Sequence, residues 1–147
     1  MTEEVTDARQ ALTVADLEAW VRRSAELITE HAEELTALDA AIGDGDHGTN
    51  MARGMATAAT ITPGPDTTTR QYLNQVGMAL VSSVGGASGP LYGTFFLRVG
   101  QLWQSPYTVY SVCQALKAGR DGIASRGRAK VGDKTMLDAL CPAIDVL

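Results

Sequence analysis

Residues 13–38 read TVADLEAWVRRSAELITEHAEELTAL, and this stretch decides the fold class. Thr13 and Asp16 have the form of a capping box, in which the threonine hydroxyl accepts from an orphan amide and the aspartate reaches back. Behind this start, apolar residues recur at helical spacing, and charged residues lie mostly elsewhere around the cylinder. The recurring apolar residues are Leu17, Val21, Ile28 and Leu35. We therefore expect a first helix over residues 14–38.

The same periodicity continues along the chain, interrupted by loops that contain glycine and proline. Five further helices are expected: over residues 49–60, one marked by Leu73, Val76, Leu80 and Val84 that stops at residues 85–86, one from Ser88, one over residues 108–124, and one capped by Asp133. Pro142 must kink or end the last of them. The sequence holds no convincing alternating strand and no repeat. It thus predicts an all-α bundle of about six helices.

Length and composition narrow the possible classes of protein. The chain has 147 residues, which fit a single domain over residues 1–147. A formal net charge of −5 with scattered arginines argues against a nucleic-acid partner. No apolar run approaches the roughly 20 residues that cross a bilayer, and the polar residues 1–10 are no signal peptide. Cys113 and Cys141 form no Cys-x-x-Cys pair, so we expect buried free thiols in a reducing cytoplasm.

Three aspartates, Asp39, Asp44 and Asp46, stand within eight residues among several glycines. Three carboxylates so close together repel one another, and a purely structural loop gains nothing obvious from them. A hard divalent cation reverses this, because oxygen ligands converge on it and its charge cancels theirs. Magnesium takes one or two carboxylates per ion, so three aspartates could hold two ions.

The residues alone leave a second interpretation open, namely a solvated acidic turn with an aspartate helix cap. Calcium is the competing metal. An EF-hand loop starting at Asp44 would need an oxygen ligand where Gly48 stands and a glutamate where Met55 stands. Both are missing, which favours magnesium.

The residues that follow the aspartates suit an anion. Gly48, Thr49 and Asn50 lie where the second helix is expected to start, and exposed amides at a helix N-terminus bind anions readily. The threonine hydroxyl and the asparagine amide add short donors. His47 can donate to a phosphate oxygen, although a lone histidine in a loop is more often only solvated.

A second loop has the same physical form. Residues 85–90 read GGASGP and lead small residues into another helix N-terminus. Two such loops suggest two walls of one phosphate site, whereas the alternative is a tight helix–helix connection. Residues 127–135 come close to a P-loop, but they carry one residue too many before Lys134 and follow no strand.

Three blocks of sequence resemble the nucleotide-binding (L) domain of dihydroxyacetone kinases. They are residues 38–54 (LDAAIGDGDHGTNMARG), 85–93 (GGASGPLYG) and 131–138 (VGDKTMLD). The blocks occur in the family's order with similar intervals, and the resemblance covers almost the whole chain. The related fatty-acid kinase domain has a different, proline-containing first block and fits less well.

The resemblance implies an antiparallel eight-helix barrel that binds ADP or ATP at one end. Asp39, Asp44 and Asp46 match the family's ligands for two Mg²⁺ ions. The residues that match its nucleotide contacts are His47, Gly48, Thr49, Asn50, Ala87 and Ser88, and Gly127 and Met136 fall near positions that line the base. No residue of this chain is assigned a catalytic role.

The resemblance also implies a function. In bacterial three-subunit systems, the L subunit keeps ADP bound, a phosphotransferase-system protein rephosphorylates it, and the γ-phosphate passes to dihydroxyacetone held on a partner subunit. We therefore expect a kinase subunit that is active only with its partner. Three alternatives stay open: the L domain of an ATP-dependent dihydroxyacetone kinase, a non-catalytic nucleotide-binding module that docks to a regulator, and a metal-dependent phosphatase or phosphodiesterase.

One departure concerns the C-terminal part. The family domain continues beyond the block near Asp138 with further helices, whereas this sequence stops at Leu147. We expect an incomplete barrel, with a larger effect on nucleotide affinity than on the metal site. Exposed apolar helix faces would then favour self-association, for example as a homodimer.

Overall fold

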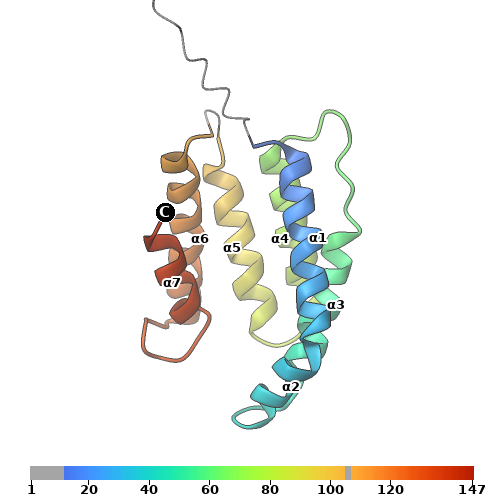
Figure 1. The fold of residues 1–147 in the computed structure, drawn as a ribbon, viewed down its shortest axis with the longest axis vertical. Coiled ribbons are helices and arrows are strands. Elements are labelled where there is room, and N and C mark those ends of the chain that lie inside the picture. The colour runs from blue at the N-terminus through green and yellow to red at the C-terminus, as the bar shows by residue number, and fades with distance from the viewer. Residues whose placement is uncertain (1–11, 105–106) are drawn as a thin grey trace, which may run out of the picture.

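The structure is a computed structural model that describes residues 12–104 and 107–147 (Figure 1). Those residues form helices and no strand, which confirms the predicted all-α class. The helices are α1 (Val14–Glu30), α2 (Ala32–Ala40), α3 (His47–Ala59), α4 (Thr69–Ser83), α5 (Ser88–Leu102), α6 (Val109–Gly127) and α7 (Leu137–Asp145).

The long helices run antiparallel, and each packs on its neighbours in the bundle. Figure 1 shows α1, α4 and α6 beginning at the upper end, and α3, α5 and α7 beginning at the lower end. The order of packing is α1 on α3, α3 on α4, α4 on α5, α5 on α6, and α6 on α7. The α2–α3, α4–α5 and α6–α7 connections therefore all lie at the lower end.

The first expected helix is divided in two. Residues 14–38 do not form one rod, because the backbone at His31 (φ −100°, ψ 12°) separates α1 from α2. The His31 amide still donates to the Leu27 carbonyl (3.0 Å), so the hydrogen bonding continues through a change of direction. The bend brings α2 against α3. Neither proline nor glycine occurs in residues 14–40, so the sequence carried no signal for it.

Other boundaries also differ from expectation, among them the end of α6, which lies at Gly127 and not at residue 124. Helix α3 begins at His47, earlier than predicted. Asp133 does not cap α7; its carboxylate accepts the Lys130 amide (2.9 Å), while Asp138 accepts the amides of Gly132 (2.8 Å) and Thr135 (3.0 Å). Pro142 lies inside α7 without ending it, since proline there removes a single helical hydrogen bond.

The hydrophobic core lies between the packed helices. Its fully buried large side chains are Tyr72, Leu73, Leu80, Ile123, Leu137, Val21, Val76 and Val99. In the described part of the chain, α1 does not pack directly on α6 or α7. An apolar hollow of about 200 Å³ lies between α1 and α7, with Trp20 of α1 on one side and Leu140 of α7 on the other. None of the described helices is long and apolar enough to span a membrane.

Candidate functional site

The three aspartates meet at the lower end of the bundle. Asp39 lies in the last turn of α2, and Asp44 and Asp46 lie in the loop that leads to α3. One carboxylate oxygen from each residue lies within 4.8 Å of the others. Asp39 is half-buried, and the other two are exposed. The expectation that Asp39 ends a helix and faces the two loop carboxylates is therefore confirmed, while their binding of a metal stays a prediction.

Asp39 is held in place by the backbone that follows it. Its Oδ2 accepts the amides of Asp46 (3.0 Å) and His47 (3.2 Å). The Asp46 amide is the main cause of a lowered pKa of Asp39. A side chain at Gly43 would collide with the Asp39 carboxylate. Residues 43–47 thus pack closely around the Asp39 carboxylate, and their amides favour its charged form.

Asp44 is in the opposite electrostatic position. Its hydrogen bond and charge interaction with the Asp46 carboxylate raise the pKa of Asp44, and Asp39 adds to the effect. Two exposed carboxylates that share one location disfavour each other's charge. A divalent cation between them would remove this repulsion, which is the chemistry that suits Mg²⁺ and its oxygen ligands.

The N-terminus of α3 lies directly beside the aspartates. Asp46 is the N-cap residue but makes no side-chain cap hydrogen bond. Gly48 is buried against α2, where a Cβ would overlap the Ala32 carbonyl oxygen, so only glycine allows this approach. Thr49 is exposed, and Asn50 is buried. First-turn amides have no partner within their own helix, and Asp39 accepts those of Asp46 and His47. The amides of Gly48 and Thr49 are therefore the ones suited to an anion.

The N-terminus of α5 is open in the same way. Gly86 has φ +66°, a left-handed conformation that favours glycine, and it turns the chain from α4 into α5. Ala87 is the N-cap residue and has no side chain that could cap the helix. By contrast, α1, α4 and α6 each begin with a capping box. The two helices that follow the glycine-rich loops are thus left without side-chain caps.

The two loops are joined to each other. The Oγ of Ser88 lies 3.2 Å from Nδ1 of His47, across 41 positions of sequence. A Cβ on Gly85 would lie 3.0 Å from Nδ2 of Asn50, so the second loop rests against the first turn of α3. The structure therefore brings together His47, Gly48, Asn50 and Ser88, as two walls of one site require.

One residue of this contact was not expected from the sequence. Arg53 of α3 donates from Nη2 to Oδ1 of Asn50 (2.7 Å) and from Nε to the Ser83 carbonyl (3.2 Å). It links the start of α3 to the end of α4. The only signal in the sequence was its place within the 38–54 block.

Gly127 and Met136 lie on the third connection at the same end. Gly127 is the last residue of α6, with the Leu91 side chain close to it, and Met136 is the half-buried N-cap residue of α7. In the described part of the chain, neither forms a hydrogen bond with the acidic loop or with residues 85–88. Their predicted contact with a nucleotide base stays a prediction.

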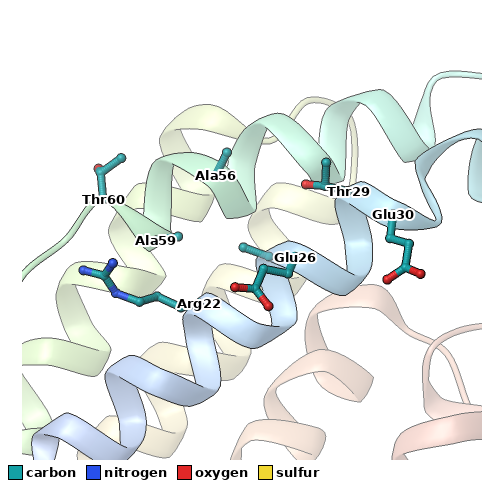
Figure 2. Close-up of a pocket in the computed structure, with 8 residues that line it drawn as sticks. Arg22, Glu26, Thr29, Glu30, Ala56, Ala59 and Thr60 are labelled. Carbon is teal, nitrogen blue, oxygen red and sulfur yellow. The ribbon is translucent and has the colours of Figure 1, made fainter.

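A large open groove lies elsewhere. Figure 2 shows it between α1 and α3, with Arg22, Glu26 and Glu30 on one side and Ala56 and Ala59 on the other. Its volume is about 630 Å³. None of the predicted site residues lines this groove, and its Arg22 is paired with Glu18 (2.7 Å). Size alone therefore does not identify the site.

Fold and geometry together define a helical domain with a candidate cation and phosphate site at one end. The DAK2 domain family matches residues 41–147. The chain belongs to the DAK2 domain family.

Similar proteins include dihydroxyacetone kinase subunits. The ADP-binding subunit DhaL of the PEP-dependent dihydroxyacetone kinase of Escherichia coli (strain K12) is 44% identical over 131 residues, covering 87% of this chain and 62% of that protein. DhaL of PEP-dependent dihydroxyacetone kinase 1 of Listeria innocua is 41% identical over 132 residues, covering 87% and 66%. The chain thus spans less than two thirds of the length of these relatives.

A solved structure confirms the fold. The dihydroxyacetone kinase from C. freundii, crystallised with AMP-PNP and Mg²⁺, matches with a TM-score of 0.77 and 28% identity. The match covers 99% of this chain and 28% of that chain.

Proposed function

We propose that this chain binds ADP or ATP through Mg²⁺ at the lower end of the bundle and serves as a dihydroxyacetone kinase subunit. The observation that carries the proposal is the convergence of three carboxylates beside two helix N-termini without side-chain caps. The neighbouring C. freundii kinase was solved with a nucleotide analogue and Mg²⁺, which is consistent with that chemistry.

The residues present suit these roles. Asp39, Asp44 and Asp46 would hold the cations, two in number by the family resemblance, because one carboxylate oxygen of each lies within 4.8 Å of the others. Open amides of α3 and α5 would receive phosphate oxygens, and bound Mg²⁺ would neutralise the charge that develops there. The bond from Ser88 to Nδ1 leaves Nε2 of His47 to face a ligand.

The direction of transfer and the partners are part of the proposal. We assign no general base in this chain, because its three clustered carboxylates would be bound to cations and Nδ1 of His47 lies 3.2 Å from Ser88 Oγ. A dihydroxyacetone-binding subunit would then supply the base and the substrate, and a phosphotransferase-system protein would rephosphorylate the bound ADP. The relatives named PEP-dependent kinases support this choice of donor over ATP.

Calorimetry tests nucleotide binding directly. ADP is titrated into the protein with and without Mg²⁺, and we expect heat of binding only when Mg²⁺ is present. Binding that is equal in EDTA, or no binding at all, would refute the proposed site. Asp44→Asn is the matched variant, and its expected loss is given in the Discussion.

Activity tests the proposed division of labour. The purified chain with ATP and dihydroxyacetone should give no dihydroxyacetone phosphate, and product should form once the dihydroxyacetone-binding subunit and the phosphoprotein donor are added. Product with ATP and that subunit alone would favour an ATP-dependent enzyme. Nucleotide binding with no product in either mixture would favour a non-catalytic module. Sedimentation of the same samples reports whether the chain forms the predicted homodimer.

A further inference from the structure

Arg53 connects the two walls of the site without belonging to either loop. It is an exposed residue on α3, yet its guanidinium reaches Asn50 on its own helix and the Ser83 carbonyl at the end of α4. The second bond spans 30 positions of sequence. Such a bridge fixes the distance between the start of α3 and the start of the 84–87 loop.

The bond to Asn50 has a consequence for chemistry. A guanidinium can only donate, so the Asn50 atom that it contacts at 2.7 Å must be the carbonyl oxygen. This fixes the orientation of the side-chain amide. The whole amide lies against the glycine-rich loop, since a Cβ on Gly85 would lie 3.0 Å from Nδ2 and 3.1 Å from both Cγ and Oδ1 of Asn50. Because Asn50 is only 9% exposed, it has little freedom to choose another orientation.

The bond to Ser83 acts on the other wall. Ser83 is the last residue of α4, and carbonyls in the last turn lack partners within the helix. A positive group is favoured there by the helix dipole. Next to it, Gly54 packs so closely against Val84 that a Cβ would overlap the valine side chain. Arg53 therefore adds an oriented polar link at a point where the two helices already touch.

We propose that Arg53 is a positioning residue, which orients the Asn50 amide and holds the 84–87 loop against α3 so that both walls present their donors to one phosphate group. This inference rests on the proposed nucleotide function. Two nitrogens of the Arg53 guanidinium make the two contacts: Nε donates to Ser83 and Nη2 donates to Asn50. A lysine has a single side-chain nitrogen and lacks this planar pair of donors.

The test compares four variants by calorimetry: Arg53→Ala, Arg53→Lys, Asn50→Ala and the Arg53→Ala/Asn50→Ala double variant. Arg23→Ala is the matched control, because Arg23 is an exposed arginine of α1 whose ion pair within residues 12–104 and 107–147 is with Glu26 (3.0 Å). We expect Arg53→Ala to weaken Mg–ADP binding about tenfold. Binding of Mn²⁺ alone should stay within about twofold, because Arg53 contacts none of the aspartates.

The variants separate positioning from general damage. Arg53→Lys keeps the charge and the aliphatic stem, so it should fold and yet recover little of the lost affinity. If Arg53 acts through Asn50, the double variant should bind Mg–ADP less weakly than the product of the two single losses predicts. Without ligand, amide hydrogen exchange of residues 84–88 should accelerate in Arg53→Ala and not in Arg23→Ala.

Several results would overturn the inference: Mg–ADP affinity of Arg53→Ala equal to that of the control, full recovery by lysine, single losses that combine independently, or an equal loss of Mn²⁺ binding. Wild-type protein that fails to bind Mg–ADP overturns both this inference and the proposed function. Wild-type binding with an unaffected Arg53→Ala variant overturns the positioning role alone.

Discussion

The two helices that follow the glycine-rich loops, α3 and α5, begin differently from the helices that begin at the opposite end of the bundle. At the upper end of Figure 1, the hydroxyls of Thr13, Thr68 and Thr108 each accept an amide of the first turn of α1, α4 and α6. At the lower end, α3 and α5 begin with no side-chain cap at Asp46 or Ala87. Every helix leaves its first amides unpaired within itself, and the capping boxes help to satisfy those of α1, α4 and α6. In α3 the Asp39 carboxylate accepts the amides of Asp46 and His47, so the amides of Gly48 and Thr49 are the ones that suit a ligand.

The carboxylates follow the same division. At the upper end, hydrogen bonds from the Thr13 amide and hydroxyl lower the pKa of Asp16. At the lower end, the Asp46 carboxylate raises the pKa of Asp44. The first charge is stabilised by the protein's own donors, whereas the second is opposed by its neighbours. Backbone amides also lower the pKa of Asp39 and Asp138 at the lower end, so the opposed charge belongs to the Asp44–Asp46 pair.

The largest expected effect comes from Gly48→Ala at the lower end. The added Cβ would overlap the Ala32 carbonyl oxygen, so α2 and α3 must separate and Asp39 must move with α2. Overpacking of this kind costs about 1–3 kcal/mol in the free energy of unfolding, measured by urea denaturation. Gly64→Ala is the control, because its Cβ would meet only Thr67 Oγ1, at 3.6 Å. Equal unfolding midpoints for the two variants would contradict the close approach of α2 and α3.

The next largest effect is expected from Asp44→Asn, which should change Mg–ADP affinity without lowering the melting temperature. It removes the charge of a predicted cation ligand, so Mg–ADP affinity should fall more than about tenfold, or about 1.4 kcal/mol. The melting temperature without metal should not fall, because the lost charge was opposed by Asp46. The control is Asp16→Asn, which should lower the melting temperature and leave Mg–ADP affinity unchanged. Similar behaviour of the two aspartates would remove the distinction between the ends.

A smaller effect is expected from removing one hydroxyl at each end. Thr68→Ala deletes an N-cap and should cost about 1 kcal/mol of stability, by urea denaturation, with no change in nucleotide affinity. Ser88→Ala deletes the bond to His47 and should weaken Mg–ADP binding a few-fold, by calorimetry, with little change in stability. The two-end comparison fails if Thr68→Ala weakens binding as much as Ser88→Ala does.

Much of the fold could be read from the sequence because helical periodicity is a local property. The capping box at Thr13 and Asp16 and the two glycine-rich loops appear where they were expected. The division at His31 could not be predicted, because it comes from the packing of α2 on α3 and involves no helix-breaking residue. The expected cap by Asp133 was wrong because its carboxylate accepts the Lys130 amide, while Asp138 inside α7 accepts the Gly132 and Thr135 amides of the preceding loop.

The candidate site was predictable only in part. The acidic loop is local, and its convergence followed from the position of Asp39 at a helix end. The bond between His47 and Ser88 supports the expected meeting of the two loops. Arg53 was not found, because its bond to Ser83 joins positions far apart and depends on how α3 and α4 pack. Long-range polar contacts of this kind leave no periodic trace in a single sequence.

The smallest expected effect is the pH dependence of the metal-free protein. The folded pKa of Asp44 is raised above its ordinary value of 3.8, so the folded state holds that proton more tightly than the unfolded state does. Its contribution to stability therefore falls as pH rises through the window that begins near 3.8. Asp39 has a lowered pKa, so its stabilisation is present above 3.8 and is lost as pH falls through its folded pKa.

Thermal melts across this pH range, in EDTA and in Mg²⁺, separate the two carboxylates. Asp44→Asn in EDTA should lose the decline above pH 3.8 and keep the loss below it, because Asp39 is unchanged. Mg²⁺ should suppress the same decline in the wild-type protein, since a bound cation offsets the repulsion that protonation would otherwise relieve. A wild-type curve that Mg²⁺ leaves unchanged would mean that the three carboxylates do not share a cation, and the lower end would then differ from the upper end only in its missing caps.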